Sequence, residues 1–452
     1  MRPRRESCGS DCLRLSSQIA FDLENKPSRR LKQGPLHPPR TSSRLMEPSM
    51  ISLRSIRFDA LDEAVIELEK IGVPSDQSHT RAIDTVSLHI KAEEVPPAMI
   101  PHLQDVALAL EVRLIRPGRA AENSETQDIL LSGTVRQMAQ MARILRDEPF
   151  GLCGFSQELE TLLTNLRRTR LTIPCRTRTL VVGEKTLIMG AINITPDSFS
   201  DGGLYLQPQR AVDLALDMVA QGVDIIDIGG ESTKPGSRGV DAEEELRRVI
   251  PVIQGIRAQT DTLLSVDTRK ARVAREALEA GCQIVNDVTA LRSDSEMAHV
   301  AARHGAVIVL MHMRGTPETM QRDIHYGSLI SEIITYLRES IDLAEKAGID
   351  REKIIIDPGI GFGKTVDHNL AIIKHLDQFR ILGQPILIGT SRKSFIGKIL
   401  DLDVDQRQEG TLASVVASIL HGAHIVRVHD VRNAVRAARI ADAVKTVSLP
   451  EV

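Results

Sequence analysis

Eight short runs rich in Val and Ile, spaced along the chain from residue 186 onward, constrain the fold more than any other feature. The runs are TLIMGAINI, DIIDIGG, LLSVDT, QIVNDV, AVIVLMHM, KIIIDPG, PILIGTS and HIVRVHD. Each has the length of a strand and is followed by room for a helix. Strands that are apolar on both faces belong to parallel sheets covered by helices. Eight successive strand and helix units therefore predict an α/β fold of the (β/α)8 TIM-barrel class.

A doubly wound open sheet is the structural alternative for the same order of strands and helices. Dinucleotide-binding sheets of that kind carry the pattern G-x-G-x-x-G after their first strand. Here the first run continues as GAINITPDSFSDGG, which does not give that pattern. The barrel is therefore the preferred prediction.

Two other regions precede the predicted barrel, which we assign to residues 176–452. Residues 1–50 are rich in Arg, Ser and Pro and have few core-forming residues, which predicts a disordered leader. We interpret it as a flexible leader or the result of an upstream start, with Met46 and Met50 near its end. Its acidic residues disfavour a transit peptide, and the lack of an apolar h-region excludes a secretory signal.

Short amphipathic elements fill residues 51–175, which we predict to be a small α/β domain. Apolar periodicity predicts helices in DALDEAVIELEKIG, PAMIPHLQDVALAL and VRQMAQMARIL, and strands in TVSLHIKA, VRLIR and DILLSG. No catalytic group of residues stands out there, so the region has the composition of a packing or interaction domain. TIPCRTRTLVVGEKT then leads into the barrel.

Composition excludes several classes of protein. Hydrophobic residues make up 42% of the chain and charged residues 26%, and no apolar run approaches the roughly 20 residues of a membrane span. A net charge of -3 argues against a general nucleic-acid binder. Five scattered cysteines do not form a disulfide framework. We expect a cytoplasmic protein with neither a membrane nor a nucleic-acid partner.

Polar residues close most of the eight apolar runs. They are Asn193, Asp227, Glu231, Asp267, Asn286, Asp357, Lys393, Arg427 and His429. Ligands bind at the C-terminal ends of the strands in barrels of this class. Single residues have plainer explanations: Asp267 could cap the next helix, Asp357 could brace a turn and Asn286 could satisfy loop backbone. Capping does not need this mixture of residue types, so the ring as a whole predicts a binding site.

Four of these residues suit a flat heterocycle with an amino-pyrimidinone edge: Asp267, Asn286, Asp357 and Lys393. A carboxylate accepts from ring N–H and exocyclic amine groups, an Asn donates and accepts, and a Lys donates to a ring carbonyl.

Three others suit an anion. Arg427 would present a planar fork to phosphate oxygens, His429 would donate to a leaving oxygen and the Asn193 carbonyl would bind Mg²⁺. Phosphate sites after strands seven and eight are common in this fold.

Two further motifs are ambiguous. GFGKT resembles the end of a P-loop, but the position that must be Gly is Pro358. Three glycines at 359, 361 and 363 favour a tight turn or a close approach of backbone to a flat ligand. His312 is interpreted as a packed core histidine, with a role as base or ligand left open.

Eight segments in this order resemble the dihydropteroate synthases of the folate pathway. They are NITPDSFSDGG, DIIDIGGESTKPG, SVDTRK, IVNDV, LMHMRGTPETMQ, DPGIGFGKT, GTSRKSFIG and RVHDV, within residues 186–445. The resemblance implies condensation of a dihydropterin pyrophosphate with p-aminobenzoate by a Mg²⁺-dependent homodimer that is a target of sulfonamides. The preceding α/β region resembles an extension that some bacterial members carry.

The resemblance also assigns roles to individual residues. It places the pterin on Asp267, Asn286, Asp357 and Lys393, and the pyrophosphate with Mg²⁺ on Asn193, Arg427 and His429. It places p-aminobenzoate against Phe362 and Ser394. It places four residues in loops that close over the reacting centre: Asp201, Thr233, Lys234 and Pro235. The chemistry would rest on Arg427, His429, Lys393, Asp201 and Lys234. The family more often has Arg at position 234, and Lys cannot form a bidentate fork.

The implied reaction is a substitution at a methylene carbon, with loss of pyrophosphate running ahead of attack by the amine. No nucleophile and base pair stands out, in agreement with that chemistry. Two alternatives differ in class. A methyltransferase that binds methyltetrahydrofolate on a similar barrel would lack SRKSF and RVHDV, which are present. A catalytically silent pterin-binding scaffold would not need Asn193, Lys393, Arg427 and His429.

Overall fold

In the computed structural model of the chain, eight parallel strands form the sheet that the sequence predicts. They are β6 (Leu187–Asn193), β7 (Ile225–Gly229), β8 (Leu263–Asp267), β9 (Ile284–Asp287), β10 (Val307–Met311), β11 (Ile354–Asp357), β12 (Leu387–Ile388) and β13 (Ile425–Val428). Their order is β11-β10-β9-β8-β7-β6-β13-β12. A parallel bridge between Ile356 and Ile386 joins the two ends of this order. The sheet is therefore closed, and the (β/α)8 prediction is confirmed over the open sheet.

The structure describes residues 56, 58, 61–117, 125–148, 151–194, 206–232, 237, 239–316 and 318–447. The predicted leader, residues 1–50, lies outside the described residues. No helix in the described part is both long and apolar enough to cross a membrane.

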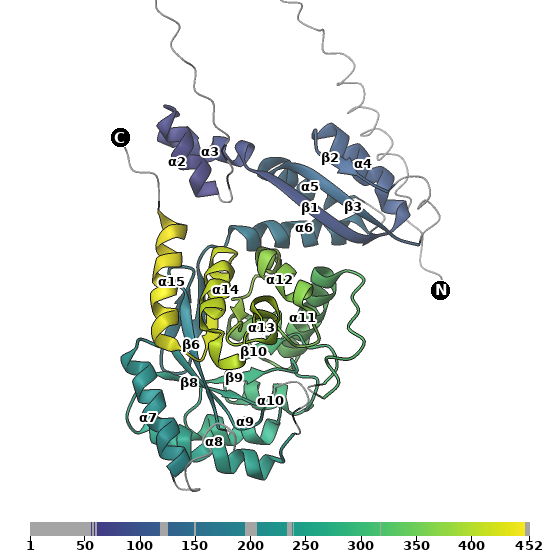
Figure 1. The fold of residues 1–452 in the computed structure, drawn as a ribbon. Helices are drawn as coiled ribbons and strands as arrows, with labels where there is room; N and C mark the ends of the chain where they lie inside the picture. Colours follow the sequence, from purple (N-terminus) through teal and green to yellow (C-terminus); the bar gives the residue numbers. More distant parts are fainter. Residues whose placement is uncertain are drawn as a thin grey trace, which may run out of the picture. The chain divides into compact units, whose positions relative to one another are not determined.

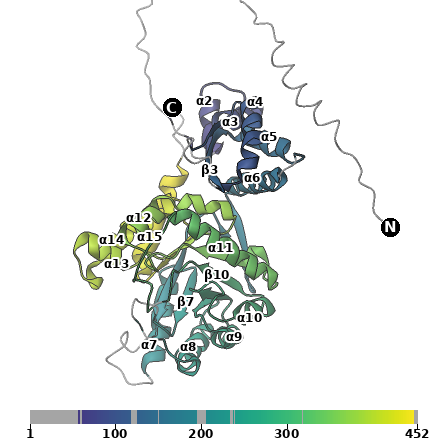
Figure 2. The same ribbon diagram turned by 90° about the vertical axis from the view of Figure 1, so that its right-hand side faces the viewer.

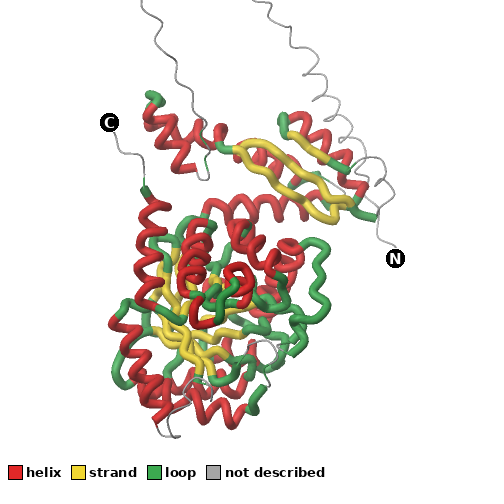
Figure 3. Tube along the Cα trace, viewed as in Figure 1, coloured by secondary structure: helices red, strands yellow, loops and turns green. Residues whose placement is uncertain are grey.

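Helices surround the strands of the barrel (Figures 1, 2 and 3). They are α7 (Leu206–Ala220), α8 (Ala242–Arg257), α9 (Ala271–Ala280), α10 (Met297–Arg303), α11 (Leu329–Lys346), α12 (Val366–Lys374), α13 (Ser394–Leu400), α14 (Gln408–Leu420) and α15 (Val431–Thr446). Three short 3₁₀ helices accompany them: η4 (Arg351–Lys353), η5 (Leu376–Leu382) and η6 (Val404–Gln406). The outward side chains of the strands and the inner faces of the helices form the largest hydrophobic core.

Helix α8 shows why the sequence forms these elements. The Asp241 side chain caps its first turn by accepting from the Glu244 backbone N–H, and acidic residues in that turn complement the helix dipole. Leu246, Val249 and Ile253 lie at helical spacing and are buried against the barrel.

A β-hairpin closes the N-terminal end of the barrel. Its strands are β4 (Leu171–Pro174) and β5 (Thr179–Val182), paired antiparallel. Ile173, Leu180 and Val182 of the hairpin form one buried cluster with residues at the start of every barrel strand. Those strand residues are Leu187, Ile225, Leu263, Ile284, Val307, Ile355, Leu387 and Ile425. The sequence analysis treated this segment as a linker and did not predict the hairpin.

The region before the hairpin contains a three-stranded antiparallel sheet in the order β1-β3-β2. Its elements are α2 (Leu61–Lys70), α3 (Ser75–Thr85), β1 (Ser87–Val95), η1 (Pro97–Met99), α4 (Ile100–Ala109), β2 (Arg113–Ile115), β3 (Gln127–Thr134), α5 (Val135–Leu145) and α6 (Leu152–Arg167). Helices α4, α5 and α6 share a buried core with β1 and β3. The predicted strands and three predicted helices are confirmed, whereas α3 and α6 were not predicted.

The end of α6 contacts the 3₁₀ helix η5 of the barrel. Asn165 Nδ2 donates to the Ile381 carbonyl at 2.7 Å, and the Arg380 guanidinium donates to the Leu166 carbonyl at 2.8 Å. Gly383 has a left-handed backbone (φ 70°), and a Cβ there would lie 2.6 Å from Asn165 Oδ1. The position of a domain boundary near residue 175 stays a prediction.

Candidate active site

The polar residues predicted at the strand ends meet in a cluster at the C-terminal end of the barrel. Asp267 ends β8, Asp357 ends β11 and Asn286 lies in β9. Their side chains are buried, with 8%, 6% and 4% of each residue exposed. Buried polar groups are normally hydrogen-bonded, so their partners indicate what each residue does.

Asp227 of β7 connects three other members of this cluster. It is fully buried, and its Oδ2 accepts from Arg427 Nε at 2.7 Å and from Asn286 Nδ2 at 3.0 Å. Arg427 Nη2 in turn donates to Asp267 Oδ2 at 2.8 Å. Arg427 Nη1 has no hydrogen bond to any residue that the structure describes. The sequence places Asp227 at a strand end with no role and Arg427 in the anion site alone. The structure places Asp227 inside β7 and Arg427 beside two carboxylates.

These contacts decide between the explanations that the sequence left open. Asp267 does not cap α9: the N-cap residue is Lys270, and the Ala271 N–H donates instead to Asp294 Oδ2 at 2.8 Å. Asn286 bonds Asp227 rather than loop backbone. Asp357 does brace its turn, because its Oδ1 accepts from the Gly359 backbone N–H at 2.7 Å.

Burial moves the pKa values of two carboxyl groups and one amine of the cluster toward 7. It raises the pKa of Asp357 to about 6, and it raises the pKa of Asp267 to about 7 with Arg427 opposing the effect. Burial, together with the neighbouring Arg427, lowers the pKa of Lys393 to about 8. Burial also disfavours the charge on Arg427, but Asp227 and Asp267 outweigh it and raise the pKa of Arg427 above its usual range.

Asn193 and His429 lie together at the ends of β6 and β13. Asn193 Nδ2 is 3.3 Å from His429 Nε2, and His429 Nδ1 is 2.9 Å from Ser391 Oγ. An amide nitrogen can only donate, so this arrangement favours a proton on Nδ1 and a lone pair on Nε2 of His429. The sequence analysis did not identify Ser391 as the partner that orients this ring.

Oxygen atoms of two candidate residues border the space above Gly229. A Cβ built on Gly229 would lie 3.7 Å from Asn193 Oδ1 and 3.7 Å from Asp267 Oδ2. Amide and carboxylate oxygens are the protein ligands that Mg²⁺ prefers. Within the described residues no three His, Cys, Asp or Glu side chains group as a metal site. Asn193 Oδ1 and Asp267 Oδ2 could supply at most two ligands of a Mg²⁺ ion, and the remaining oxygens would have to come from a bound phosphate group or water.

An apolar wall borders the polar cluster. Phe362, Val288, Met311, Met313 and Met320 form one buried group. Lys393 Nζ lies 4.1 Å from the centre of the Phe362 ring, a cation–π contact. Ser394, the first residue of α13, is exposed. The sequence analysis identified Phe362 but not the methionines that pack with it.

Four predicted site residues lie outside the described residues: Asp201, Thr233, Lys234 and Pro235. Nearby, buried Glu231 accepts from Arg269 Nε at 2.9 Å and also pairs with Lys270. Burial alone would raise the pKa of Glu231, but Lys270 and Arg269 outweigh it and lower the pKa.

His312 is packed in the core. It is 5% exposed, its ring meets Tyr336 edge to face at 4.7 Å, and its Nδ1 accepts from Lys364 Nζ at 2.9 Å. Burial lowers the pKa of His312 to about 2, so the ring is neutral. The interpretation of His312 as a packed histidine agrees with these contacts.

The barrel region of the chain is similar to known proteins. The pterin binding enzyme family matches residues 189–429, more than half of the chain, a span that runs from within β6 to just past β13. The chain belongs to the dihydropteroate synthases. The dihydropteroate synthase of Bacillus subtilis is 50% identical over 260 residues, which cover 58% of this chain and 89% of that protein.

A solved dihydropteroate synthase and a longer relative extend the comparison. The Xanthomonas albilineans enzyme, solved with 4-aminobenzoic acid, is 42% identical with a TM-score of 0.58 and covers 62% of this chain and 100% of its own. A probable bifunctional folylpolyglutamate synthase/dihydropteroate synthase of Halobacterium salinarum is 40% identical over 389 residues, 86% of this chain and 46% of that protein. That match is too long to fit within residues 176–452, so it includes part of the α/β region.

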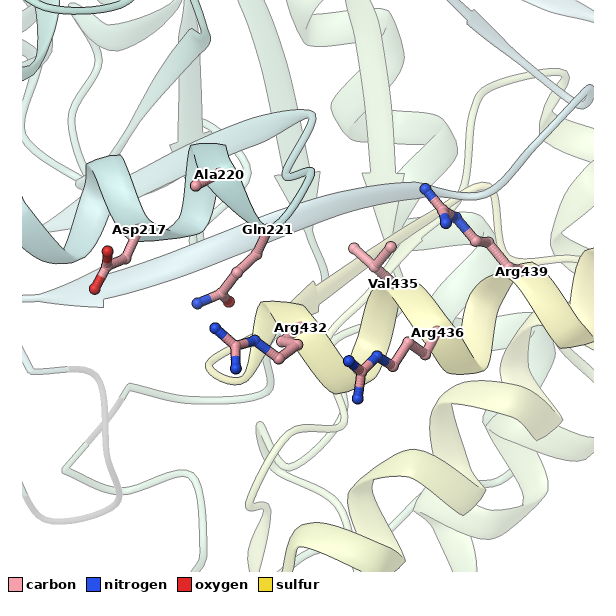
Figure 4. A pocket seen from close by; sticks show the side chains of 7 residues that line it. All are labelled: Asp217, Ala220, Gln221, Arg432, Val435, Arg436 and Arg439. Atoms are coloured by element: carbon pink, nitrogen blue, oxygen red, sulfur yellow. The ribbon is translucent and has the colours of Figure 1, made fainter.

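A groove of about 300 Å³ lies between α7 and α15, apart from the cluster at the strand ends (Figure 4). Its lining residues are Asp217, Ala220, Gln221, Arg432, Val435, Arg436 and Arg439. Gln221, just after α7, points toward Arg432 of α15 (Figure 4). None of the predicted site residues lines this groove. The candidate active site is therefore the strand-end cluster, where buried charges and an apolar wall meet.

Proposed function

We propose that the strand-end cluster catalyses the dihydropteroate synthase reaction. In this reaction (7,8-dihydropterin-6-yl)methyl diphosphate and 4-aminobenzoate give 7,8-dihydropteroate and diphosphate, a step of folate biosynthesis. The observation that carries the proposal is the chain of contacts from Asn286 through Asp227 and Arg427 to Asp267. It links the groups suited to a pterin with the group suited to an anion.

The pterin would bind across the buried carboxylates. Asp267 and Asp357 would accept hydrogen bonds from its N–H groups, and Lys393 would donate to the ring carbonyl. Asn286 would donate to and accept from the same edge of the ring. Three of these residues are buried, so an unmatched heterocycle would leave their polar groups without partners. Selectivity for the pterin would follow from that penalty.

The reaction breaks the bond between the methylene carbon and the diphosphate oxygen, and the electron pair leaves with diphosphate. The electron-rich dihydropterin shares the positive charge left on the carbon. The lone pair of the neutral aryl amine then forms the C–N bond, and the amine releases a proton. Arg427 would stabilise the departing anion through Nη1 while Asp227 and Asp267 hold its other nitrogens.

Asn193 and His429 would complete the diphosphate site. Asn193 Oδ1 faces the space above Gly229, where it would hold Mg²⁺ together with diphosphate oxygens. When bound, Mg²⁺ would supply positive charge to those oxygens. Ser391 would hold the ring of His429 through Nδ1, and Nε2, protonated when the anion binds, would donate to the leaving oxygen in place of its contact with Asn193. Asp201, Thr233, Lys234 and Pro235 remain predicted members of the site.

The aryl amine would bind beside the pterin, against Phe362 and near Ser394. The Phe362 ring supplies an apolar surface for the benzene ring of 4-aminobenzoate. A sulfonamide has a similar aryl amine and would compete for the same surface.

An assay of the purified full chain tests the proposal. With dihydropterin diphosphate, 4-aminobenzoate and Mg²⁺ we expect equal amounts of dihydropteroate and diphosphate. A folded protein that forms neither product would contradict the proposal. Methyl transfer from methyltetrahydrofolate would favour the methyltransferase alternative, and pterin binding without turnover would favour the silent scaffold.

We further propose that the enzyme is a homodimer. Ile440, Val444 and Val447, at the end of α15, are 68%, 59% and 73% exposed, an apolar surface suited to a second copy of the chain. Light scattering after size-exclusion chromatography should give twice the chain mass of 49.7 kDa. A mass of one chain at micromolar concentration would contradict the dimer.

We also propose that the enzyme acts in the cytoplasm, as the scattered cysteines suggest. Cys153, Cys175 and Cys282 are free thiols in the structure, and Cys282 is buried. Fractionation of the source cells should recover the activity with cytoplasmic markers.

A further inference from the structure

The segment that follows β11 carries Phe362 on an unusual backbone. Gly359, Gly361 and Gly363 all have left-handed φ angles of 74°, 83° and 68°. A Cβ on Gly359 would lie 1.9 Å from the His312 carbonyl oxygen, so the segment packs closely against the end of β10. Phe362 itself is only 7% exposed.

Three consecutive carbonyl groups in this segment each accept a hydrogen bond from a side chain. Gln321 Nε2 donates to the Gly361 carbonyl at 3.0 Å. Lys364 Nζ donates to the Phe362 carbonyl at 3.0 Å, and Tyr326 Oη donates to the Gly363 carbonyl at 2.9 Å. Side chains rather than a neighbouring strand therefore hold the backbone on both sides of the Phe362 ring.

Lys364 also ties the segment to β10. Its Nζ is 2.9 Å from His312 Nδ1 and 3.4 Å from the His312 carbonyl oxygen, and the residue is 3% exposed. Burial lowers the pKa of Lys364 to about 7, which reflects how far this amine is removed from water. A buried amine with three acceptors has a single favourable position, so it makes a rigid link between the two segments.

Tyr326 belongs to the chain between β10 and α11 and is half-buried. Its ring lies 4.7 Å from the Arg314 guanidinium and 5.1 Å from the His368 ring, contacts that limit its rotation. Gln321 is exposed, and water can replace its hydrogen bond to Gly361. Lys364 and Tyr326 are therefore the stronger links.

We propose that Lys364 and Tyr326 are positioning residues that fix the backbone around Phe362 and thereby set the affinity for the aryl amine. The inference rests on the proposed function, in which Phe362 borders the 4-aminobenzoate site. Neither residue contacts the polar strand-end cluster through a hydrogen bond that the structure describes. Loss of the Tyr326 hydroxyl should therefore weaken binding of the aryl amine and leave binding of the pterin unchanged. The charge of Lys364 also interacts with Asp357 and Lys393, so its loss should affect both substrates, the aryl amine more strongly.

Tyr326→Phe is the sharpest test, because it removes one hydroxyl and keeps the ring. We expect the KM for 4-aminobenzoate and the Ki of a sulfonamide to rise roughly threefold to tenfold, the range for one lost hydrogen bond. The KM for the pterin diphosphate and the thermal midpoint should stay near those of the unmodified enzyme. Lys364→Met should raise the same two constants further.

Tyr336→Phe is the matched control. Its hydroxyl also donates to a carbonyl, that of Thr289 at 3.2 Å, outside the Phe362 segment. It should leave the KM for 4-aminobenzoate unchanged. The proposal is overturned if the folded Tyr326→Phe variant keeps the KM for 4-aminobenzoate and the Ki of the sulfonamide unchanged. It is also overturned if the KM values for both substrates rise equally. Failure of the proposed function would appear earlier, as a lack of product from the unmodified enzyme, and would overturn this inference with it.

Discussion

The two ends of the barrel are built from the same eight strands but have opposite chemistry. At the N-terminal end the first residues of the strands are aliphatic and pack against the hairpin β4–β5, with Ile173 fully buried. At the C-terminal end the same strands carry Asp227, Asp267, Asn286 and Arg427. The buried contacts between the strands and the hairpin are mainly aliphatic at one end, whereas the other end depends on charges whose partners come from distant strands.

This difference separates stability from function. Burial of the aliphatic end contributes free energy of folding in proportion to the apolar area removed from water. Buried ion pairs contribute less net stability because their desolvation opposes their attraction. Substitutions at the two ends should therefore change different measurements.

Arg427→Lys should produce the largest effect on activity. A lysine keeps the charge but cannot hold Asp227 and Asp267 while also binding diphosphate. We expect kcat/KM for the pterin diphosphate to fall by about 10²–10³-fold, as when one preorganised donor is removed. Arg432→Lys on α15, outside the cluster, is the control and should keep full activity. Equal activity of the two variants would show that the charge of Arg427 suffices.

Ile173→Ala should mainly lower stability. The side chain is fully buried under the barrel, so its truncation should cost about 2–5 kcal/mol in the free energy of unfolding. Urea unfolding measures that loss, and kcat/KM of the folded protein should be unchanged. A large change in kcat/KM without a loss of stability would mean that the two ends are coupled.

Asp227→Asn and Asp224→Asn compare a cluster residue inside β7 with a residue just before that strand. Asp224 lies before β7, where it accepts from the Ile188 N–H at 2.9 Å and pairs with Lys185 at 2.7 Å. Asp227→Asn keeps the shape but weakens the hold on Arg427, so we expect kcat/KM to fall by about tenfold.

Asp224→Asn should keep kcat/KM and lower the free energy of unfolding by about 1 kcal/mol. Steady-state kinetics and urea unfolding of both variants provide the measurement. A fall in activity in the Asp224 variant, or none in the Asp227 variant, would contradict the comparison.

The pH dependence of the reaction should show the smallest effect. The pKa of Lys393 is lowered to about 8, so the side chain loses its proton as the pH rises through that value. We expect kcat/KM for the pterin diphosphate to fall above about pH 8 as the charged donor is lost. Lys393→Arg should move that fall to higher pH, because Arg stays protonated. A flat profile from pH 7 to 10 in the unmodified enzyme would contradict a charged role for Lys393.

Much of the fold follows from local pattern. The apolar runs predicted all eight strands, since each run is buried on both faces in the barrel. The polar residues that close most of the runs predicted the cluster, because parallel strands place their C-terminal ends together. Helix α3 was missed because only Ser78 and Ala82 of it are buried, too few to give an apolar period.

Sequence alone determined the barrel and the residue types that gather at the C-terminal ends of its strands. Tertiary structure decided the partners: Arg427 meets Asp227 and Asp267, 200 and 160 residues away, and the hairpin seals the opposite end. The physical reason is the range of each signal. The apolar pattern of a strand depends only on residues that are neighbours in the sequence. A buried ion pair depends on the register of strands that meet only when the barrel closes.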